Sequence, residues 1–323
     1  MSSPVVSVIV PNYNHSKFLQ KRLDSILNQT YQDFEVIILD DCSQDNSTEI
    51  IESYREHPNV ITIEYNAINS GSPFKQWAKG ISLSKGEYIW IAESDDWCEP
   101  SFLDTLVSPM LKDPKIKISY CQSICLDQNN KIKWVSNHEF LEQVIEGEEF
   151  VRQFMLKGNS IFNASMAVFR KTALPLKDHY IHYQFCGDWF FWIEVALKGD
   201  VLISGKVLNY FRKHSQDISS KARVKGLYYL ESTDIILHTL QKIKHSEREV
   251  AEIIEKRARS FLEDENAFES QEVRNKVISK LNELDPSFVR KTNRIKTSQK
   301  IGNIKRKINA RVRKWDLGGS VLL

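Results

Sequence analysis

The sequence predicts an α/β protein with a mostly parallel sheet flanked by helices and a C-terminal helical extension. Three observations support this fold class. In about the first 120 residues, short apolar runs alternate with segments whose apolar residues recur at helical spacing. Polar and acidic residues follow the apolar runs, as ligand-binding residues do at the carboxyl ends of parallel strands. Beyond about residue 220 the apolar spacing is helical throughout.

Short apolar runs predict four strands, and the first of them is a continuous run of the kind found in strands covered on both faces. These runs are residues 5–10, 35–39, 60–65 and 87–92. A first helix is expected over residues 16–29, where apolar residues lie on one face: Phe18, Leu19, Leu23, Ile26 and Leu27. Asp45 opens a second helix, and Pro73 suits the first turn of a third, which ends before Gly86.

The middle of the chain mixes strands with helices. Strands are expected over residues 116–120, 167–170, 201–204 and 207–211, and helical segments near residues 147–157 and 187–198. We therefore expect a sheet domain over residues 1–220, with halves 1–115 and 116–220, a helical extension over residues 221–285, and a basic tail over residues 286–323.

The composition is that of an ordinary globular protein. Of the 323 residues, 41% are hydrophobic and 27% are charged, and a net charge of +2 is too small for nucleic acid or membrane to be the main partner. No apolar run is long enough to span a bilayer, and the N-terminus lacks the basic start of a signal peptide. The five scattered cysteines predict free thiols in a reducing cytoplasm.

The strongest chemical signal is Glu93-Ser94-Asp95-Asp96, directly after the fourth predicted strand. Three carboxylates in four residues repel one another unless a cation lies nearby. Mg²⁺ and Mn²⁺ prefer oxygen ligands and often bind through one or two carboxylates together with substrate phosphates. The cluster therefore suggests a metal that bridges a diphosphate. The alternatives are a solvated acidic turn, or a helix start that Asp96 caps.

A second acidic pair, Asp40-Asp41, closes the second predicted strand. A carboxylate there can accept hydrogen bonds from a nucleobase N–H or a ribose hydroxyl, or it can begin a turn. The first strand is followed by Pro11-Asn12-Tyr13-Asn14 in place of a glycine-rich turn, which argues against a dinucleotide-dependent oxidoreductase. Because two acidic strand ends coincide, a nucleotide site with a metal is the favoured interpretation.

Several ordered blocks resemble glycosyltransferase family 2, whose members adopt the GT-A fold, a Rossmann-like architecture. The blocks are VSVIVPNYNHSKFLQKRLDSILNQTYQDFEVIILDDCSQDNS, Asn69-Ser70-Gly71, KGEYIWIAESDDWCEP, FNASMAVFRKTAL, CGDWFFWIEVALKGD and LNYFRKHSQDIS. The resemblance covers about residues 5–220 and implies a catalytic domain whose first half binds a nucleotide sugar and whose second half binds the acceptor.

The resemblance also implies site residues. Residues expected to contact the nucleotide or donor sugar are Pro11, Tyr13, Asp40, Asp41, Asn69, Gly71, Lys75, Glu93, Asp96 and Arg212. Asp95 is the expected principal ligand of Mn²⁺ or Mg²⁺, with Asp96 and His214 as further ligands. The family usually has Asp at the position of Glu93, so the longer side chain is expected to shift the geometry or to act through a neighbouring ligand.

Asp188 is the expected catalytic base. It matches the family's Glu-Asp block, in which the usual first acid is replaced here by Gly187. An acceptor hydroxyl that attacks the anomeric carbon must lose its proton, and one carboxylate within hydrogen-bond reach can take it. A single displacement inverts the anomeric centre. The alternative role for Asp188 is to cap the helix that follows.

The leading interpretation is an inverting, metal-dependent glycosyltransferase that uses a UDP-sugar and a glycan or lipid-linked acceptor, in cell-envelope polysaccharide biosynthesis. Two rivals remain: a nucleotide-sugar-binding protein of the same fold with little or no turnover, and a nucleotidyltransferase. The expected location is cytoplasmic. The basic tail, residues 286–323, either lies on the anionic inner face of the cell membrane, or is solvated, or packs on the catalytic domain. Nucleic acid is not an expected partner.

Overall fold

The computed structural model of this protein describes residues 4–175, 178–213 and 218–298. The chain divides into two compact units, Met1–Ile218 and Ser219–Leu323. The predicted α/β sheet flanked by helices, followed by a helical C-terminal part, is confirmed.

The first unit is built on a sheet whose described residues form ten strands, with the main order β3-β2-β1-β4-β9-β6-β10-β5. Its first four strands are β1 (Val6–Asn12), β2 (Phe34–Asp40), β3 (Val60–Tyr65) and β4 (Tyr88–Ile91). They run parallel and are connected by α1 (Ser16–Leu27), α2 (Ser47–Ser53) and α3 (Pro73–Leu83). Both β1 and β2 are buried along their whole length, which explains why their sequences are continuously apolar.

Beyond β4 the sheet is mixed. Strand β9 (Ala167–Arg170) lies antiparallel between β4 and β6 (Ile116–Leu126), and β6 pairs in parallel with β10 (Asp200–Arg212). The short strands are β5 (Trp97–Cys98) and β8 (Glu142–Ile145), which pair with β10, and β7 (Ile132–Val135), which pairs with β6.

Strand β10 is one continuous strand where the sequence predicts two. The predicted break coincides with a register shift between the pairs formed by Ile203 and Val207. Gly205 lies inside this irregularity, and a Cβ atom there would meet the carbonyl oxygen of Phe140 at 2.3 Å. The glycine therefore allows a neighbouring segment to approach closely while the strand continues.

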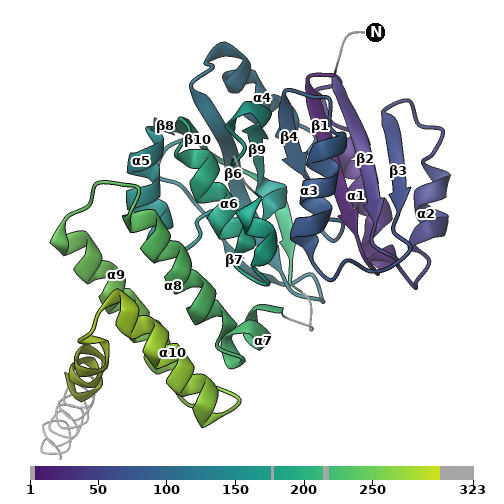
Figure 1. Cartoon of the computed structure of the whole chain (residues 1–323). Helices are drawn as coiled ribbons and strands as arrows, with labels where there is room; N and C mark the ends of the chain where they lie inside the picture. The colour runs from purple at the N-terminus through teal and green to yellow at the C-terminus, as the bar shows by residue number, and fades with distance from the viewer. Residues whose placement is uncertain (1–3, 176–177, 214–217, 299–323) are drawn as a thin grey trace, which may run out of the picture. The chain divides into compact units, whose positions relative to one another are not determined.

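Helices cover both faces of the sheet (Figure 1). The further helices of this unit include α4 (Phe102–Lys112), α5 (Gly147–Phe150) and α6 (Gly187–Ala196). On one face, Trp77 of α3 contacts Phe191 of α6, with ring centroids 5.8 Å apart. On the other face, Trp90 of β4 stacks on Phe102 of α4 at 4.4 Å and lies beneath Arg22 of α1. Each of the buried aromatic side chains contributes about 1.5–3 kcal/mol through burial.

The carboxyl ends of β1, β2 and β4 meet at one edge of the sheet. Asn12 pairs in register with Asp40, the last residue of β2, and Ile9 pairs with Ile91, the last residue of β4. The polar residues that follow these strands therefore lie along the same edge, as expected for a parallel α/β sheet.

The second unit is helical. It contains α8 (Leu227–Leu240), α9 (Glu247–Asp264) and α10 (Gln271–Leu284), and residues 288–298 are also helical, whereas α7 (Ile218–Val224) begins at the boundary between the units. A reciprocal capping box between Ser246 and Glu249 fixes the start of α9. The core of the unit consists of Tyr229, Ile254, Ala258, Phe261, Val277, Leu281 and Phe288.

Phe288 is fully buried, so the first part of the predicted basic tail belongs to this core. Residues 299–323, most of the basic tail for which membrane contact is one prediction, lie outside the described residues. None of the described helices combines the length and the apolar character that crossing a membrane requires.

Candidate active site

Asp40 ties together the loops that follow β1 and β2. Its carboxylate accepts hydrogen bonds from the Asn12 side chain at 2.8 Å and from the backbone N–H and hydroxyl of Ser43 at 2.8 and 2.6 Å. Asp40 is buried, so these donors take the place of the water that a carboxylate otherwise binds. This geometry gives Asp40 a part in shaping both loops, and its predicted contact with the donor stays a prediction.

Asp41 holds the loop that precedes α3. Its carboxylate accepts hydrogen bonds from the side chains of Asn66 at 2.6 Å and Gln76 at 2.8 Å, and from the backbone N–H and hydroxyl of Ser70 at 2.9 and 2.8 Å. An ionised carboxylate offers about four acceptor positions, so these donors are enough to satisfy it. Asp41 therefore fixes the shape of this loop through its hydrogen bonds.

Asn69, Gly71 and Lys75 belong to the same segment. The Asn69 side chain donates to the main-chain oxygen of Asp41 at 2.9 Å and accepts from the backbone N–H of Gly71 at 2.8 Å. Gly71 has a φ of 71°, in the left-handed region where glycine avoids strain. The exposed Lys75 donates to the main-chain oxygen of Ser70 at 3.0 Å. Residues 69–75 therefore form a loop and helix start whose shape is fixed by internal contacts.

The acidic loop, residues 93–96, follows β4. Glu93 accepts a hydrogen bond from the Trp77 indole N–H at 2.9 Å. Asp96 is buried and accepts from the Asn163 side chain at 2.5 Å and from the backbone N–H of Arg212 at 3.0 Å. Asp96 therefore faces into the protein, where it joins the acidic loop to the segment around residue 163 and to the end of β10.

The carboxylates of the acidic loop repel one another. Removal from water and the charge of Asp95 raise the pKa of Glu93 to about 8, and the same two causes raise the pKa of Asp96. Asp95 is half-buried. Each raised pKa records a cost of keeping negative charge in this loop, and a cation at the loop would relieve that cost.

Arg212 packs against the acidic loop. Its guanidinium lies 4.4 Å from the ring centres of both Phe18 and Trp97 and donates to the main-chain oxygen of Asp95 at 2.6 Å. Burial lowers the pKa of Arg212, while the negative charges of Asp96 and Asp95 oppose this shift. The contacts give Arg212 a role in holding the loop, and its predicted contact with a diphosphate stays a prediction.

Arg22 is a second buried cation, which the sequence-based reasoning missed. It is fully buried 4.8 Å above the Trp90 ring, and its three guanidinium nitrogens have no hydrogen-bond partner among the described residues. Its charge lowers the pKa of Glu93 and of Asp96, against the stronger causes that raise them. A signal was visible in the sequence, since Arg22 occupies the apolar face of the helix together with Leu19, Leu23 and Ile26.

Helix α3 joins the two acidic strand ends. Gln76 donates to Asp41 and the next residue, Trp77, donates to Glu93, so one helical turn contacts both loops. The loop after β1 is tied to the acidic loop as well, because the His15 ring nitrogen Nδ1 lies 2.8 Å from the Ser94 hydroxyl. The expectation that these strand ends come together is therefore confirmed in space, although the ligands of the individual residues are not tested.

Asp188 lies in the first turn of α6. The helix begins at Gly187 with Cys186 as its N-cap residue, so the alternative that Asp188 caps this helix is wrong. The Asp188 carboxylate accepts a hydrogen bond from the Asn159 side chain at 2.9 Å. Asn159 and Asn163 belong to one short segment, so this segment links Asp188 to Asp96. Neither asparagine was recognised from the sequence, since nothing in their spacing marks them.

Gly187 has a packing reason for lacking a side chain. A Cβ atom at this position would lie 2.6 Å from the main-chain oxygen of Tyr180 and 2.7 Å from the Phe74 ring. The place that the family's usual acid would occupy is therefore filled by neighbouring groups of this chain. The departure from the family pattern follows from local packing and leaves Asp188 at the start of the helix.

The residues of the acidic loop fit a divalent cation. Their donors are hard carboxylate oxygens, which suit Mg²⁺ and Mn²⁺. Within the described residues no three His, Cys, Asp or Glu side chains form a complete metal site. Such a loop would bind the cation together with substrate phosphates, as magnesium sites in nucleotide-dependent enzymes often do. His214, the other predicted ligand, lies outside the described residues.

Pro11 and Tyr13 close the site at the end of β1. Pro11 is buried, whereas Tyr13 is 45% exposed, and the next residue, Asn14, bonds to Ser43 and Gln44 of the loop after β2. An exposed aromatic ring at the carboxyl edge of the sheet can stack on a nucleobase.

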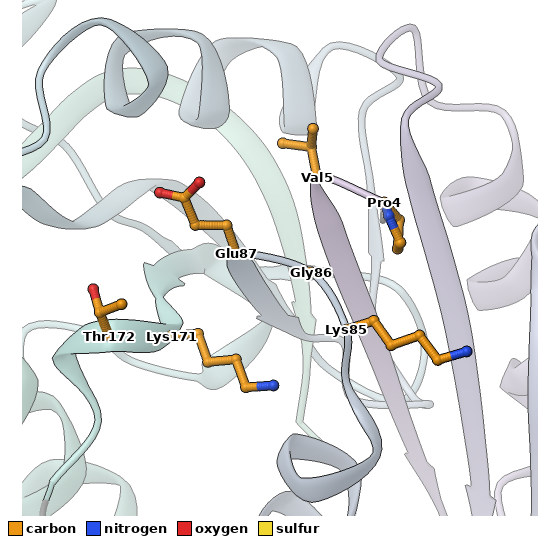
Figure 2. A pocket seen from close by; sticks show the side chains of 7 residues that line it. All are labelled: Pro4, Val5, Lys85, Gly86, Glu87, Lys171 and Thr172. Carbon is orange, nitrogen blue, oxygen red and sulfur yellow. The ribbon is translucent and has the colours of Figure 1, made fainter. Parts of the chain in front are cut away.

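A distinct pocket lies at the opposite edge of the sheet (Figure 2). It is lined by Pro4, Val5, Lys85, Gly86, Glu87, Lys171 and Thr172, which precede β1 and β4 or follow β9. Two of its charged groups already have partners, since Lys171 donates to the main-chain oxygen of Ser84 and Glu87 pairs with Arg170. This pocket is therefore separate from the acidic loop.

Known proteins share this arrangement. The family model described as glycosyl transferase family 2 matches residues 7–175. Glycosyltransferase GlyG of Streptococcus pneumoniae is 29% identical over 207 residues, which cover 64% of this chain and 68% of that protein. An uncharacterized glycosyltransferase of Haemophilus influenzae is 26% identical over 222 residues, which cover 68% of this chain and 84% of that protein.

Among solved structures, residues 1–349 of S. aureus TarS in complex with UDP match with a TM-score of 0.65 at 19% identity, covering 87% of this chain and 81% of that chain. This likeness confirms the GT-A fold. The family model spans more than half of the 323 residues. The chain therefore belongs to glycosyl transferase family 2 and is a glycosyltransferase.

Proposed function

We propose that this enzyme transfers a sugar from a UDP-sugar to an acceptor hydroxyl, with inversion and with Mn²⁺ or Mg²⁺ at the acidic loop. One observation carries the proposal: the charged acidic loop is linked through α3 to the loop around Asp41 and through residues 159–163 to Asp188. These links support a proposal in which the donor, the metal and the base meet at one edge of the sheet.

The donor nucleotide would bind over the ends of β1 and β2. The exposed ring of Tyr13 would stack on the base, and Asp41 would order the loop that surrounds it. Uracil suits this site because its N3–H can donate to Asp41 by exchanging with one of the present donors. The solved TarS structures with UDP and UDP-GlcNAc support the choice of a uridine donor.

Asp188 would remove the proton of the acceptor hydroxyl. As the proton passes to this carboxylate, the acceptor oxygen bonds to the anomeric carbon and the bond from that carbon to the diphosphate breaks. Attack opposite the leaving group inverts the anomeric centre, so an α-linked donor gives a β-linked product. Asp95 would be the principal metal ligand, because Asp96 is engaged with internal donors. A bound divalent cation supplies positive charge for the departing diphosphate.

The acceptor would be a glycan or lipid-linked intermediate of envelope polysaccharide synthesis. We further propose a cytoplasmic location and contact of residues 286–323 with an anionic membrane. Most of that segment lies outside the described residues.

The rival of a binding protein without turnover rested on Glu93 and Gly187. Glu93 still has an anchored carboxylate, through Trp77, and Gly187 follows from packing against Tyr180. Neither departure therefore argues for lost activity.

The test is release of UDP from UDP-glucose, UDP-N-acetylglucosamine and UDP-galactose in the presence of Mn²⁺. We expect slow release from at least one donor, abolished by EDTA. Asp188→Asn should lower transfer by about 100-fold or more, because the general base is lost, while UDP affinity changes less than about twofold. Glu194→Gln, on the same helix, is the matched control.

Two outcomes would overturn parts of this proposal. Tight UDP binding with no turnover on any donor would favour the binding-protein alternative. A large loss of UDP affinity in Asp188→Asn would instead assign Asp188 to the donor site.

A further inference from the structure

Three aromatic side chains from distant parts of the chain form a cluster that the proposed mechanism does not use. Trp134 of β7 lies 4.9 Å from Phe162 and 6.2 Å from Phe211 of β10, measured between ring centroids. These three residues are called the aromatic platform below. Their interplanar angles of 60° and 51° show tilted rings that do not stack on one another.

The sheet explains how two of the three rings come together. In the register of the sheet, Cys125 of β6 pairs with Trp134 on one side and with Phe211 on the other. Residues opposite one another in neighbouring strands point to the same face, so Trp134 and Phe211 share a face of the sheet. Phe162 then adds its ring from the segment that precedes β9.

The aromatic platform lies beside both parts of the catalytic machinery. Asn163, next to Phe162, donates to Asp96, and the backbone N–H of Arg212, next to Phe211, donates to the same carboxylate. On its other side, the segment that carries Phe162 begins with Asn159, which donates to Asp188. Two rings of the platform are therefore carried by residues whose chain neighbours bond to the acidic loop, and Phe162 belongs to the short segment that also bonds to Asp188.

The rings are accessible. Phe162 is 44% exposed, and Trp134 and Phe211 are each half-buried. Aromatic surface exposed to water is a favourable place for an apolar ligand face, because covering it removes that surface from water. A pyranose ring has one face made of C–H groups and an edge of hydroxyl groups, so it can rest on an aromatic face while its hydroxyls reach nearby polar groups.

We propose that the aromatic platform is an acceptor subsite that binds a pyranose ring of a glycan, with Phe162 as its exposed contact. This inference rests on the proposed glycosyl transfer and names the class of acceptor that the enzyme takes. Phe162 orients the acceptor so that one hydroxyl faces Asp188, and it contributes nothing to donor binding.

The test measures acceptor binding separately from turnover. N-acetylchitotriose, cellotriose and maltotriose are titrated into the full-length protein with UDP and Mn²⁺, and binding is followed by saturation-transfer NMR and calorimetry. We expect at least one trisaccharide to bind, and Phe162→Ala to weaken that binding by about tenfold or more, as the loss of a stacked ring contact predicts. Phe162→Trp should retain binding within about threefold.

Phe140→Ala is the matched control. Phe140 is also a surface phenylalanine, 51% exposed, but its ring contact is with His138 and it is not part of the platform. Its replacement should change trisaccharide affinity less than about twofold. Hydrolysis of the UDP-sugar, with water as acceptor, should be equal in Phe140→Ala and the wild type.

The outcomes separate the two proposals. Normal donor hydrolysis together with unchanged trisaccharide binding in Phe162→Ala overturns the subsite and leaves the proposed function intact. Absence of donor hydrolysis in the wild type contradicts the proposed function, whereas the binding arm still reports on the subsite. Binding of none of the trisaccharides would overturn the inference. Binding of farnesyl phosphate in their place, weakened by Phe162→Ala, would assign the rings to another ligand.

Discussion

Two acidic strand ends that look alike in the sequence have opposite surroundings in the structure. After β2, Asp40 and Asp41 accept hydrogen bonds from Asn12, Ser43 and the residues of the following loop. After β4, the pKa of Glu93 is raised to about 8 by removal from water and by the charge of Asp95. Protein donors satisfy the first pair, whereas in the second loop burial and mutual repulsion disfavour the ionised carboxylates. The supply of donors, more than the presence of carboxylates, separates a structural acidic pair from a candidate metal site.

Asp95→Ala tests this comparison with the largest expected effect, because it removes one carboxylate of the acidic loop. The kcat/KM for UDP release should fall by about 1,000-fold or more, equivalent to about 4 kcal/mol, because Asp95 is the proposed principal metal ligand. The metal-free protein should unfold at the same temperature or slightly higher, since a like charge beside Glu93 is removed. Thermal unfolding with and without Mn²⁺ measures this, and the wild type alone should gain stability from the metal. Retained activity above one tenth would show that the acidic loop is not the metal site.

Asp41→Ala should lower the stability of the protein and leave metal binding intact, the opposite of what is expected for Asp95→Ala. Removing the carboxylate leaves buried donors of Ser70 and Gln76 without their acceptor, so we expect a loss of about 2–4 kcal/mol of unfolding free energy in urea denaturation. Stabilisation by Mn²⁺ should persist. A variant that is as stable as the wild type would contradict the organising role assigned to Asp41.

Gly187→Ala tests whether packing explains the missing acid. The new Cβ would meet the Tyr180 oxygen at 2.6 Å, so unfolding free energy should fall by about 1–3 kcal/mol, although alanine is the better helix former. Gly71→Ala is a useful control, because nothing lies within 4 Å of its Cβ and only the φ of 71° opposes the change. That variant should lose about 1 kcal/mol. An unchanged stability in Gly187→Ala would reopen the question of why the acid is absent.

The smallest expected effect belongs to Lys75→Ala. Its exposed ammonium donates to the main-chain oxygen of Ser70. Its attraction to the diphosphate of a bound donor would be weakened by the surrounding water and salt. The donor KM should rise about two- to fivefold, with kcat unchanged. Lys85→Ala, at the opposite edge of the sheet, should leave both constants as they are (Figure 2). An equal effect of the two substitutions would point to overall charge as the cause.

Periodicity predicts the strands that are buried on both faces. Strands β1, β2 and β4 are buried at every position, and burial on two sides favours the largely apolar runs that mark them in the sequence. Strand β3 was predicted as well, although it lies at the edge of the main strand order and is only partly buried. Strands β5, β7 and β8 have two to four residues, and the last two are largely exposed, so no apolar pattern marks them. The single strand β10 was expected as two, because the sequence does not reveal that Gly205 faces Phe140.

The site follows the same division. Asp41, Glu93 and Asp95 could be identified because they directly follow predicted strands, and the topology of a parallel sheet fixes where such residues lie. Asn159 and Asn163 could not be identified, because their contacts with Asp188 and Asp96 depend on an irregular segment without periodicity. The bond from the Trp77 indole N–H to Glu93 could not be predicted either, because it depends on how α3 packs beside the acidic loop.

The adjacency of Gln76 and Trp77 in α3 constrains how this chain can evolve. Successive residues of an α-helix are rotated by about 100°, so the two side chains reach different loops only at their present spacing. One residue inserted between them would rotate one side chain away from its partner and disconnect the loop around Asp41 from the acidic loop. Natural variants should therefore tolerate substitutions along the solvent-facing side of this helix far more readily than any change in the length of its first turns.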